Sequence, residues 1–375
     1  MQKICFKGFN SKGVAVLLCL LMTIFLITGC SGTKQETSTP DATNSTTRVI
    51  TDMAGRQVEI PTTINTIYCA VPTAEAMVCS LAPEKMVAWV FEQPDAGKKY
   101  LSDPVKELPV LGGWMGEKCT ANLEEIAKVA PDLIVFMTTL SPNYDYALKN
   151  AESITNQTNR PVVIMDSSFE NTAKVYKLMG DILGHQERAE ELSAYCEKAM
   201  NDIKEMTSKI PQDKLVRVYY AEGAGGLATD PSGSGHTEVL DFVRGVNVAD
   251  VQAKGGQGMT PVSLEQVLSW NPDVILVSTS TGGEKNYQSI LKDASWNNVK
   301  AVKDGKVYLT PSLPFNWFDR PPDIMRIIGI KWLANVLYPE YVNIDLNQEV
   351  KDFFKLFYNM DLNDEQVAEL LKNAI

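Results

Sequence analysis

Two stretches far apart in the chain follow the same pattern. TANLEEIAKVAPDLIVFMTT covers residues 120–139, and PVSLEQVLSWNPDVILVSTS covers residues 261–280. Aligned without a gap, each has a Leu-Glu pair, then helical spacing, then Pro-Asp and an aliphatic run. Proline disfavours helix in the residue before it, and a short aliphatic run is typical of a buried strand. Each copy therefore predicts a short helix, a turn and a strand, and two copies predict two similar α/β lobes.

Short β-branched runs alternate with helical patterns along most of the chain. The expected strands are 65–70, 86–91, 133–138, 162–165, 215–220, 274–279 and 307–310. The expected helices include 73–81, 123–129, 238–243 and 264–270. Such alternation is typical of parallel sheets covered by helices on both faces. The predicted fold class is α/β, with two Rossmann-like lobes that contain parallel sheets and are joined by one long backbone helix.

The segment between the two groups of strands has helical apolar spacing from residue 170 to 209. A single helix of this length would span roughly 60 Å at 1.5 Å per residue, enough to pass both lobes. Gly180 and Gly184 cost stability inside a helix, so we expect a kink or a break near them. Pro211 follows the end of the pattern.

The length of 375 residues exceeds what one hydrophobic core usually supports, which favours two domains. We place the N-terminal lobe at residues 48–168, the linker helix at 169–210 and the C-terminal lobe at 211–375. The net charge of −11 argues against nucleic-acid binding, because a basic face is needed to neutralise phosphates. The cysteines Cys69, Cys79, Cys119 and Cys196 have no metal-finger spacing. Their spacing leaves a disulfide, for instance Cys69 with Cys79, and free buried thiols both open.

The N-terminus has the features of an export signal. Three lysines precede an apolar run over residues 13–28, and small residues lead to Cys30. The ITGC ending resembles a bacterial lipobox, in which Cys30 is acylated, and an uncleaved anchor helix is the alternative. We therefore predict a lipoprotein signal peptide at 1–29 and, from its Ser/Thr-rich composition, a flexible tether at 30–47. The folded body is expected at the outer face of the cytoplasmic membrane, or in the periplasm.

Five segments, taken in order, resemble the helix-linked (class III) solute-binding proteins of ABC importers, which carry iron–siderophore complexes, haem and vitamin B12. The segments are residues 48–89 with a T-x-E loop, 111–135 with Trp and Pro-Asp, 226–249, 262–277, and 317–339 with WFDRPP. No single segment is very specific, but their order is. The resemblance implies the two-lobed fold and a ligand cleft between the lobes.

The resemblance also implies a function. We expect a lipid-anchored, monomeric receptor that needs no cofactor, is not an enzyme, and delivers a metal chelate to an ABC permease with its ATPase. An iron–siderophore complex is the first expectation, and a corrinoid or haem is the alternative. A secreted hydrolase is the alternative from another class, although G-x-S-x-G, H-E-x-x-H and P-loop motifs are absent from the sequence.

The Leu-Glu pairs of the repeat match the family's permease-docking glutamates. The matching residues are Glu124 and Glu265, one on each lobe. Each is expected in the first turn of a helix, where the helix dipole favours a carboxylate. Helix stabilisation alone is the competing explanation for both residues.

The ligand is expected at loops that follow the carboxyl ends of strands. The candidate contacts are Pro72, Thr73, Trp114, Met115, Tyr144, Tyr220, His236, Trp317, Phe318 and Arg320. Trp114, Trp317 and Arg320 are carried over from the resemblance, as an aromatic wall and a partner for acidic groups. His236, in a Gly/Ser loop, is expected as an axial ligand to the metal of a bound complex or as a capping residue. We expect residues after Pro339 to form helices on the second lobe, without an assigned function.

Overall fold

A computed structural model describes residues 46–115, 118–253 and 258–375. The predicted signal peptide, the acylation site Cys30 and nearly all of the predicted tether lie outside these residues. Within the described ranges, no helix is both long and apolar enough to span a membrane. The described residues form one compact unit.

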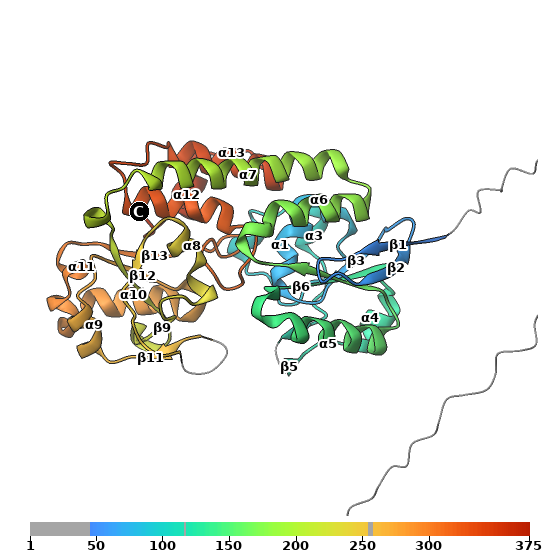
Figure 1. Cartoon of the computed structure of the whole chain (residues 1–375), viewed down its shortest axis with the longest axis horizontal. Coiled ribbons are helices and arrows are strands. Elements are labelled where there is room, and N and C mark those ends of the chain that lie inside the picture. Colours follow the sequence, from blue (N-terminus) through green and yellow to red (C-terminus); the bar gives the residue numbers. More distant parts are fainter. Residues whose placement is uncertain (1–45, 116–117, 254–257) are drawn as a thin grey trace, which may run out of the picture. The chain divides into compact units, whose positions relative to one another are not determined.

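The first lobe is built on a three-stranded parallel sheet (Figure 1). Its strands are β3 (Ile67–Cys69), β6 (Leu133–Thr138) and β7 (Val162–Asp166), in the order β3-β6-β7. The surrounding helices are α1 (Pro72–Leu81), α2 (Asp95–Lys98), α3 (Asp103–Lys106), α4 (Leu123–Val129) and α5 (Leu140–Thr158). Antiparallel pairs β1 (Thr47–Thr51) with β2 (Gln57–Pro61) and β4 (Trp114–Met115) with β5 (Lys118–Cys119) complete the lobe. The sheet is parallel, as expected.

The strand expected over residues 86–91 is absent from the described sheet, so this prediction is wrong. The segment makes only single bridges, from Met86 to Ile67 and from Trp89 to Val110. One physical reason is that the backbone N–H of Val90 donates to Oε1 of the buried Glu75 side chain at 2.6 Å. A backbone group that is bonded to a side chain cannot extend a ladder.

The second lobe repeats the plan with four parallel strands, in the order β10-β8-β12-β13. They are β8 (Arg217–Ala221), β10 (Val246–Asn247), β12 (Val274–Val277) and β13 (Val307–Leu309). Its helices are α8 (Glu238–Phe242), α9 (Leu264–Trp270), α10 (Gly283–Lys292) and α11 (Lys300–Lys303). A short antiparallel pair joins β9 (Ala228–Thr229) to β11 (Thr260–Pro261). The two predicted lobes with parallel sheets are therefore confirmed.

The sequence repeat corresponds to a structural repeat. α4 leads into β6 and α9 leads into β12, and both helices end in a left-handed residue just before the proline. Asp132 accepts hydrogen bonds from the N–H groups of Asn65 and Thr66, at 2.7 and 3.1 Å. Asp273 accepts one from the N–H of Arg217 at 3.0 Å. Each Pro-Asp aspartate thus satisfies backbone donors at the start of the neighbouring strand.

Two helices occupy the linker segment instead of one continuous helix. α6 (Thr172–Leu183) ends at Gly184, which has φ 73°, and α7 (Gln186–Ser208) follows. The break expected near Gly184 is confirmed. A Cβ on Gly180 would lie 2.3 Å from the Cβ of Ala189, so this glycine allows the two helices to pack closely. α7 is the long helix that runs across both lobes (Figure 1).

Helices form after Pro339, as expected, and the C-terminal helices contact the first lobe in addition to the second. They are α12 (Arg326–Leu337), α13 (Leu346–Tyr358) and α14 (Asp364–Leu370). The ring of Phe354 lies 5.9 Å from that of Tyr100 in the first lobe and 6.3 Å from that of Trp317. Glu369 pairs with Lys99 of the first lobe at 3.1 Å. Aromatic contacts hold these helices at the junction between the lobes.

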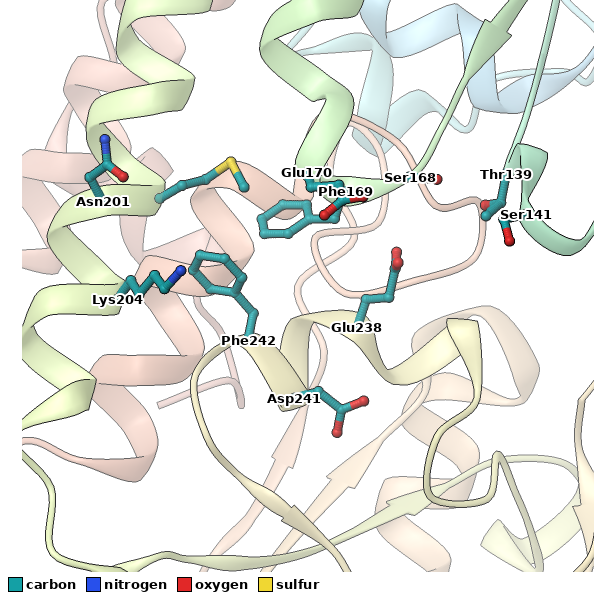
Figure 2. Close-up of a pocket in the computed structure, with 11 residues that line it drawn as sticks. Thr139, Ser141, Ser168, Phe169, Glu170, Asn201, Lys204, Glu238, Asp241 and Phe242 are labelled. Carbon is teal, nitrogen blue, oxygen red and sulfur yellow. The ribbon is translucent and has the colours of Figure 1, made fainter. Parts of the chain in front are cut away.

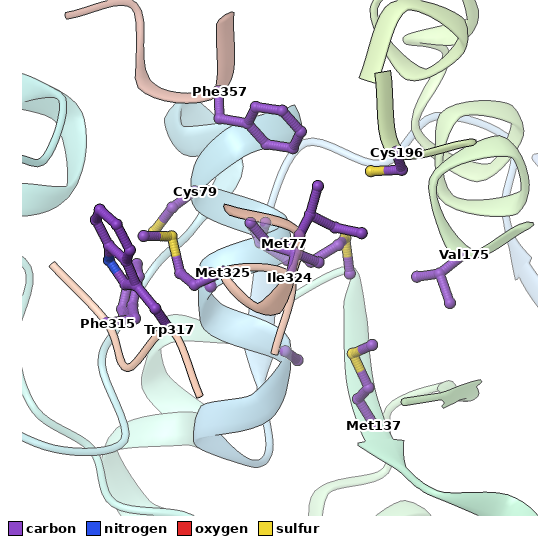
Figure 3. Packing of buried hydrophobic residues seen from close by; sticks show 14 of the residues in the cluster. Met77, Cys79, Met137, Val175, Cys196, Phe315, Trp317, Ile324, Met325 and Phe357 are labelled. Carbon is purple, nitrogen blue, oxygen red and sulfur yellow. The ribbon is translucent and has the colours of Figure 1, made fainter. Parts of the chain in front are cut away.

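The core at this junction is rich in sulfur and aromatic side chains (Figure 3). Met77 and Cys79 of α1 lie close to Met325, Trp317 and Phe357 from the C-terminal part of the chain. The described cysteines are free thiols. Three of them, Cys69, Cys79 and Cys196, are buried, and burial raises the pKa of each.

Candidate ligand-binding cleft

A cavity of about 680 Å³ lies between the two lobes. Its lining from the first lobe is Thr73, Met137, Thr138, Thr139, Ser141, Pro142, Asn143 and Ser167. Its lining from the second lobe is residues 230–236, Glu238, Val251, Ala253, Gly258 and Pro322. We call this cavity the cleft and residues 230–238 the 230–238 loop. Seven of the described lining residues carry a hydroxyl group, and Asp230 and Glu238 contribute carboxylates.

The first-lobe wall follows from the direction of the parallel strands. β6 and β7 end side by side, so the residues after them meet at one edge of the sheet. The hydroxyls of Thr139 and Ser167 hydrogen-bond each other at 3.0 Å. Asp166 accepts from the N–H of Leu140 at 3.1 Å and thereby holds the start of α5. These bonds present hydroxyl-bearing residues to the cleft in a fixed arrangement.

The second-lobe wall is the 230–238 loop, which is held by its own side chains. Ser234 accepts from the N–H of His236 at 3.2 Å and caps the short 3₁₀ turn Gly235–Thr237. The hydroxyl of Ser234 donates to the carboxylate of Asp230, also at 3.2 Å. The sequence signal for this wall is the PSGSGH motif, whose small residues suit a tight turn.

His236 is the predicted ligand contact that the structure places most clearly in the cleft. Its Nδ1 lies 2.8 Å from Oδ1 of Asp319, and its side chain is 30% exposed. Burial opposes protonation of the ring, but the hydrogen bond and charge of Asp319 outweigh it, so the pKa of His236 is raised. The ring therefore combines a fixed orientation with access to the cavity.

Arg320 lies behind the cleft in a network of acidic side chains. Its guanidinium pairs with Glu222 at 2.9 Å, with Asp230 at 2.6 Å and with Asp319 at 3.3 Å. Burial is the main cause that raises the pKa of Glu222 to about 8. Asp230, His236 and Asp319 lie close enough together to hold a metal ion. Arg320 already pairs with Asp230 and lies 3.3 Å from Asp319, and its positive charge disfavours a second cation there, which favours an internal ion-pair network over a resident metal site.

The aromatic side chains expected to form a ligand wall lie in the protein core of this structure. Trp114, Tyr220, Trp317 and Phe318 are all buried, and none of them is part of the cleft lining. Trp114 packs edge-on against Tyr68, with ring centroids 6.2 Å apart, and Phe318 packs on Tyr220 at 4.6 Å. Trp114 lies in β4 and Tyr220 in β8, and the rings of all four residues are buried, where burial of large apolar surface stabilises the fold.

The remaining predicted contacts divide between the cleft and its surroundings. Thr73 lines the cleft. Pro72, at the start of α1, and Met115, in β4, are outside the described lining. Tyr144 is also outside it, and its hydroxyl donates to the carbonyl of Ala54 at 2.9 Å.

A second hollow of about 540 Å³ adjoins the cleft and shares Thr139, Ser141 and Glu238 with it (Figure 2). Phe169 and Phe242 line it, and Lys204 reaches it from α7. Sequence reasoning missed this hollow, together with the cleft residues Ser167 and Glu238. No local motif marks these residues, since they come together only through packing of separate elements.

Glu124 and Glu265 occupy matching positions, each as the second residue of its helix, α4 or α9. Both side chains are exposed. Glu124 pairs with Lys128 at 3.0 Å. Hydrogen bonds from its own backbone N–H and from Ser263 lower the pKa of Glu265. In Figure 1 both helices lie on the side of the sheets away from α7. This arrangement allows one charged contact per lobe, both on the side of the sheets that lies away from α7.

Comparisons with known proteins agree on the kind of protein. The family model described as periplasmic binding protein matches residues 115–314. The molybdate-binding protein MolA of Haemophilus influenzae is 27% identical over 349 residues, which is 86% of this chain and 93% of the relative. The Fe(3+)-citrate-binding protein YfmC of Bacillus subtilis is 23% identical over 303 residues, or 80% and 90% of the two chains.

Solved structures lead to the same conclusion. An ABC transporter solute-binding protein from Sulfurospirillum deleyianum is 31% identical and superposes with a TM-score of 0.78. The match covers 87% of this chain and 99% of that one. The chain therefore belongs to the periplasmic binding protein family, as a solute-binding protein of ABC transporters with the class III fold.

Proposed function

We propose that the protein is the extracytoplasmic, lipid-anchored receptor of an ABC importer and that it binds a ferric chelate of the siderophore type in the cleft. The observation that carries this proposal is the placement of His236 in a cavity that seven hydroxyl-bearing residues also line. Hydroxyls and backbone N–H groups suit the oxygen-rich surface of such a chelate, and an imidazole can bind its metal. Relatives named for ferric citrate and ferric hydroxamate support the ligand class.

The same lining argues against the corrinoid and haem alternatives. A flat macrocycle is commonly held by stacked aromatic side chains. The described residues that line the cleft include no Phe, Tyr or Trp. A smaller and more polar chelate fits the lining better.

Molybdate is the second candidate, since the relative named as molybdate-binding is 27% identical to this chain. An oxyanion would be held by hydroxyls and backbone N–H groups, with a protonated His236 as a further donor. A metal in a chelate would need the neutral imidazole instead.

Calorimetric titration separates these candidates. We expect wild-type protein to bind ferric citrate or a ferric hydroxamate, and the H236A variant to bind it more weakly. Because the pKa of His236 is raised, affinity for a chelate should increase as pH rises through that pKa. Affinity for molybdate should change in the opposite direction. Binding of molybdate with no response to either chelate would reject the first candidate.

We further propose that Glu124 and Glu265 bind basic residues of the permease. Their exposure and matching positions support a pair of charged contacts, one per lobe. Reversal of both charges, E124R with E265R, should abolish uptake into cells while leaving the affinity of the purified protein unchanged. The nearby E125R variant is the control. A loss of affinity in the double variant would contradict the docking role.

A further inference from the structure

A buried carboxylate forms a hydrogen bond with the imidazole of His236. Asp319 is 1% exposed, and its Oδ1 lies 2.8 Å from Nδ1 of His236. The backbone around Asp319 is also held, because Oδ1 of Asn316 accepts from the N–H groups of Phe318 and Asp319 at 2.8 and 3.0 Å. The carboxylate is therefore fixed in a turn that does not depend on the 230–238 loop.

Two further interactions support this arrangement. Burial raises the pKa of Asp319, but the hydrogen bond with His236 and the positive charge of Arg320, 3.3 Å from Oδ2, act in the opposite direction and favour the ionised carboxylate. On the other side, the hydroxyl of Thr237 donates to the carbonyl of Ser234 at 3.1 Å and stabilises the turn that carries His236. The ring and the carboxylate are thus positioned by separate elements that meet at this hydrogen bond.

The hydrogen bond has a consequence for the other ring nitrogen. In a neutral imidazole one nitrogen donates and the other accepts. An ionised carboxylate can only accept, so Nδ1 must carry the proton. The lone pair then resides on Nε2, the nitrogen that remains for the cleft. A carboxylate in this position typically fixes the tautomer of a metal-binding histidine and increases its basicity.

We propose that Asp319 is the positioning residue for His236: it holds the proton on Nδ1, so that Nε2 can bind the metal of a chelate that leaves one coordination position open. This inference rests on the proposed function and narrows it. A chelate that fills every coordination position of its metal would gain nothing from Nε2. The cleft would accordingly prefer incompletely coordinated complexes, with Asp319 acting only through the imidazole.

The tautomer can be measured without any ligand, since the chain has only two histidines. Imidazole ¹H–¹⁵N spectra at mildly alkaline pH report which nitrogen carries the proton. We expect the Nδ1–H form for His236 in the wild-type protein and a shift toward Nε2–H in D319N. His185, which lies near Glu84, serves as the internal reference. D323N removes another buried carboxylate that does not bond His236 and should leave the tautomer unchanged.

A wild-type His236 in the Nε2–H or doubly protonated form under these conditions would overturn the proposal, even if D319N failed to fold. An unchanged tautomer in folded D319N would overturn it as well. These spectra do not depend on the identity of the ligand.

A double-mutant cycle tests the effect on binding, with ferric citrate as the probe. D319N should weaken binding roughly tenfold to a hundredfold, the usual effect of removing such a carboxylate. In the H236A background, D319N should have no further effect, because its action passes through the imidazole. Equal losses in both backgrounds would indicate a merely structural role and refute the proposal. Absence of ferric citrate binding to the wild-type protein would count against the proposed ligand. The imidazole spectra would still decide the role of Asp319.

Discussion

At the scale of single residues, three buried carboxyl groups make stability depend on pH. Glu75, Glu222 and Asp323 are each no more than 2% exposed, and burial is the main cause that raises their pKa values to about 8. The folded protein therefore holds protons that the unfolded chain releases at its ordinary carboxyl pKa. The resulting stabilisation is fully present below that ordinary value and is lost as pH rises toward about 8.

Glu75 offers the cleanest test, because it lies in the first-lobe helix α1 and bonds only backbone in the described structure. E75Q keeps a neutral side chain at every pH. We expect its unfolding free energy to fall less than that of the wild type between mildly acidic and mildly alkaline pH, by on the order of a few kcal/mol. Urea denaturation measures this difference. The exposed E340Q variant is the control, and an E75Q curve parallel to the wild type would contradict the prediction.

At the scale of elements, the two repeat units end their helices with different residues in the same left-handed conformation. Ala130 ends α4 with φ 50°, and Asn271 ends α9 with φ 44°. The left-handed region is costly for alanine but tolerated by asparagine. The two repeat units therefore allow alanine and asparagine to be compared at the same structural position.

We expect A130G to stabilise the protein by up to about 1 kcal/mol, since glycine adopts this conformation without steric cost. N271G should change stability less, because asparagine is already suited to the position. Thermal unfolding of both variants measures the difference. The idea fails if N271G stabilises more than A130G.

Element boundaries in the repeat were predictable, while some other elements were not. The helices 123–129 and 264–270 coincide with α4 and α9, because Leu-Glu at the start and Pro-Asp after the end are local signals. The strand expected at 86–91 failed because Glu75, distant in sequence, bonds the backbone of Val90. The sequence pattern within residues 86–91 gives no sign that a side chain from outside the segment will accept one of its backbone hydrogen bonds.

At the scale of the whole described body, α7 and the C-terminal helices both connect the lobes. Arg244 of the second lobe donates to the carbonyls of Thr207 and Ile210 at the end of α7, at 2.7 and 2.9 Å. Arg326 donates to the carbonyl of Ser167 in the first lobe at 2.6 Å and pairs with Glu238 in the second. Because several elements cross the junction, we expect ligand binding to move the lobes only slightly.

The junction also predicts cooperative unfolding. Phe354 is fully buried between Tyr100 and Trp317, so F354A should cost roughly 3–5 kcal/mol. Calorimetry should show one transition for both lobes, shifted to lower temperature in F354A. F91A, at a position that is 46% exposed, is the control and should change little. Two separate transitions in the wild type would show that the lobes unfold independently.

The sequence by itself determined six of the parallel strands, the helices of the repeat, the two-lobed plan and the loop that carries His236. Those features depend on periodicity and on turn residues within a few positions of one another. Only the tertiary structure decided which side chains face the cleft. The side chain of Trp317 is buried in the core, and Asp319 hydrogen-bonds His236, which lies 83 positions earlier in the sequence. The direction of a side chain depends on the surface that it can bury and on the partner that it can reach, and both come from distant parts of the chain.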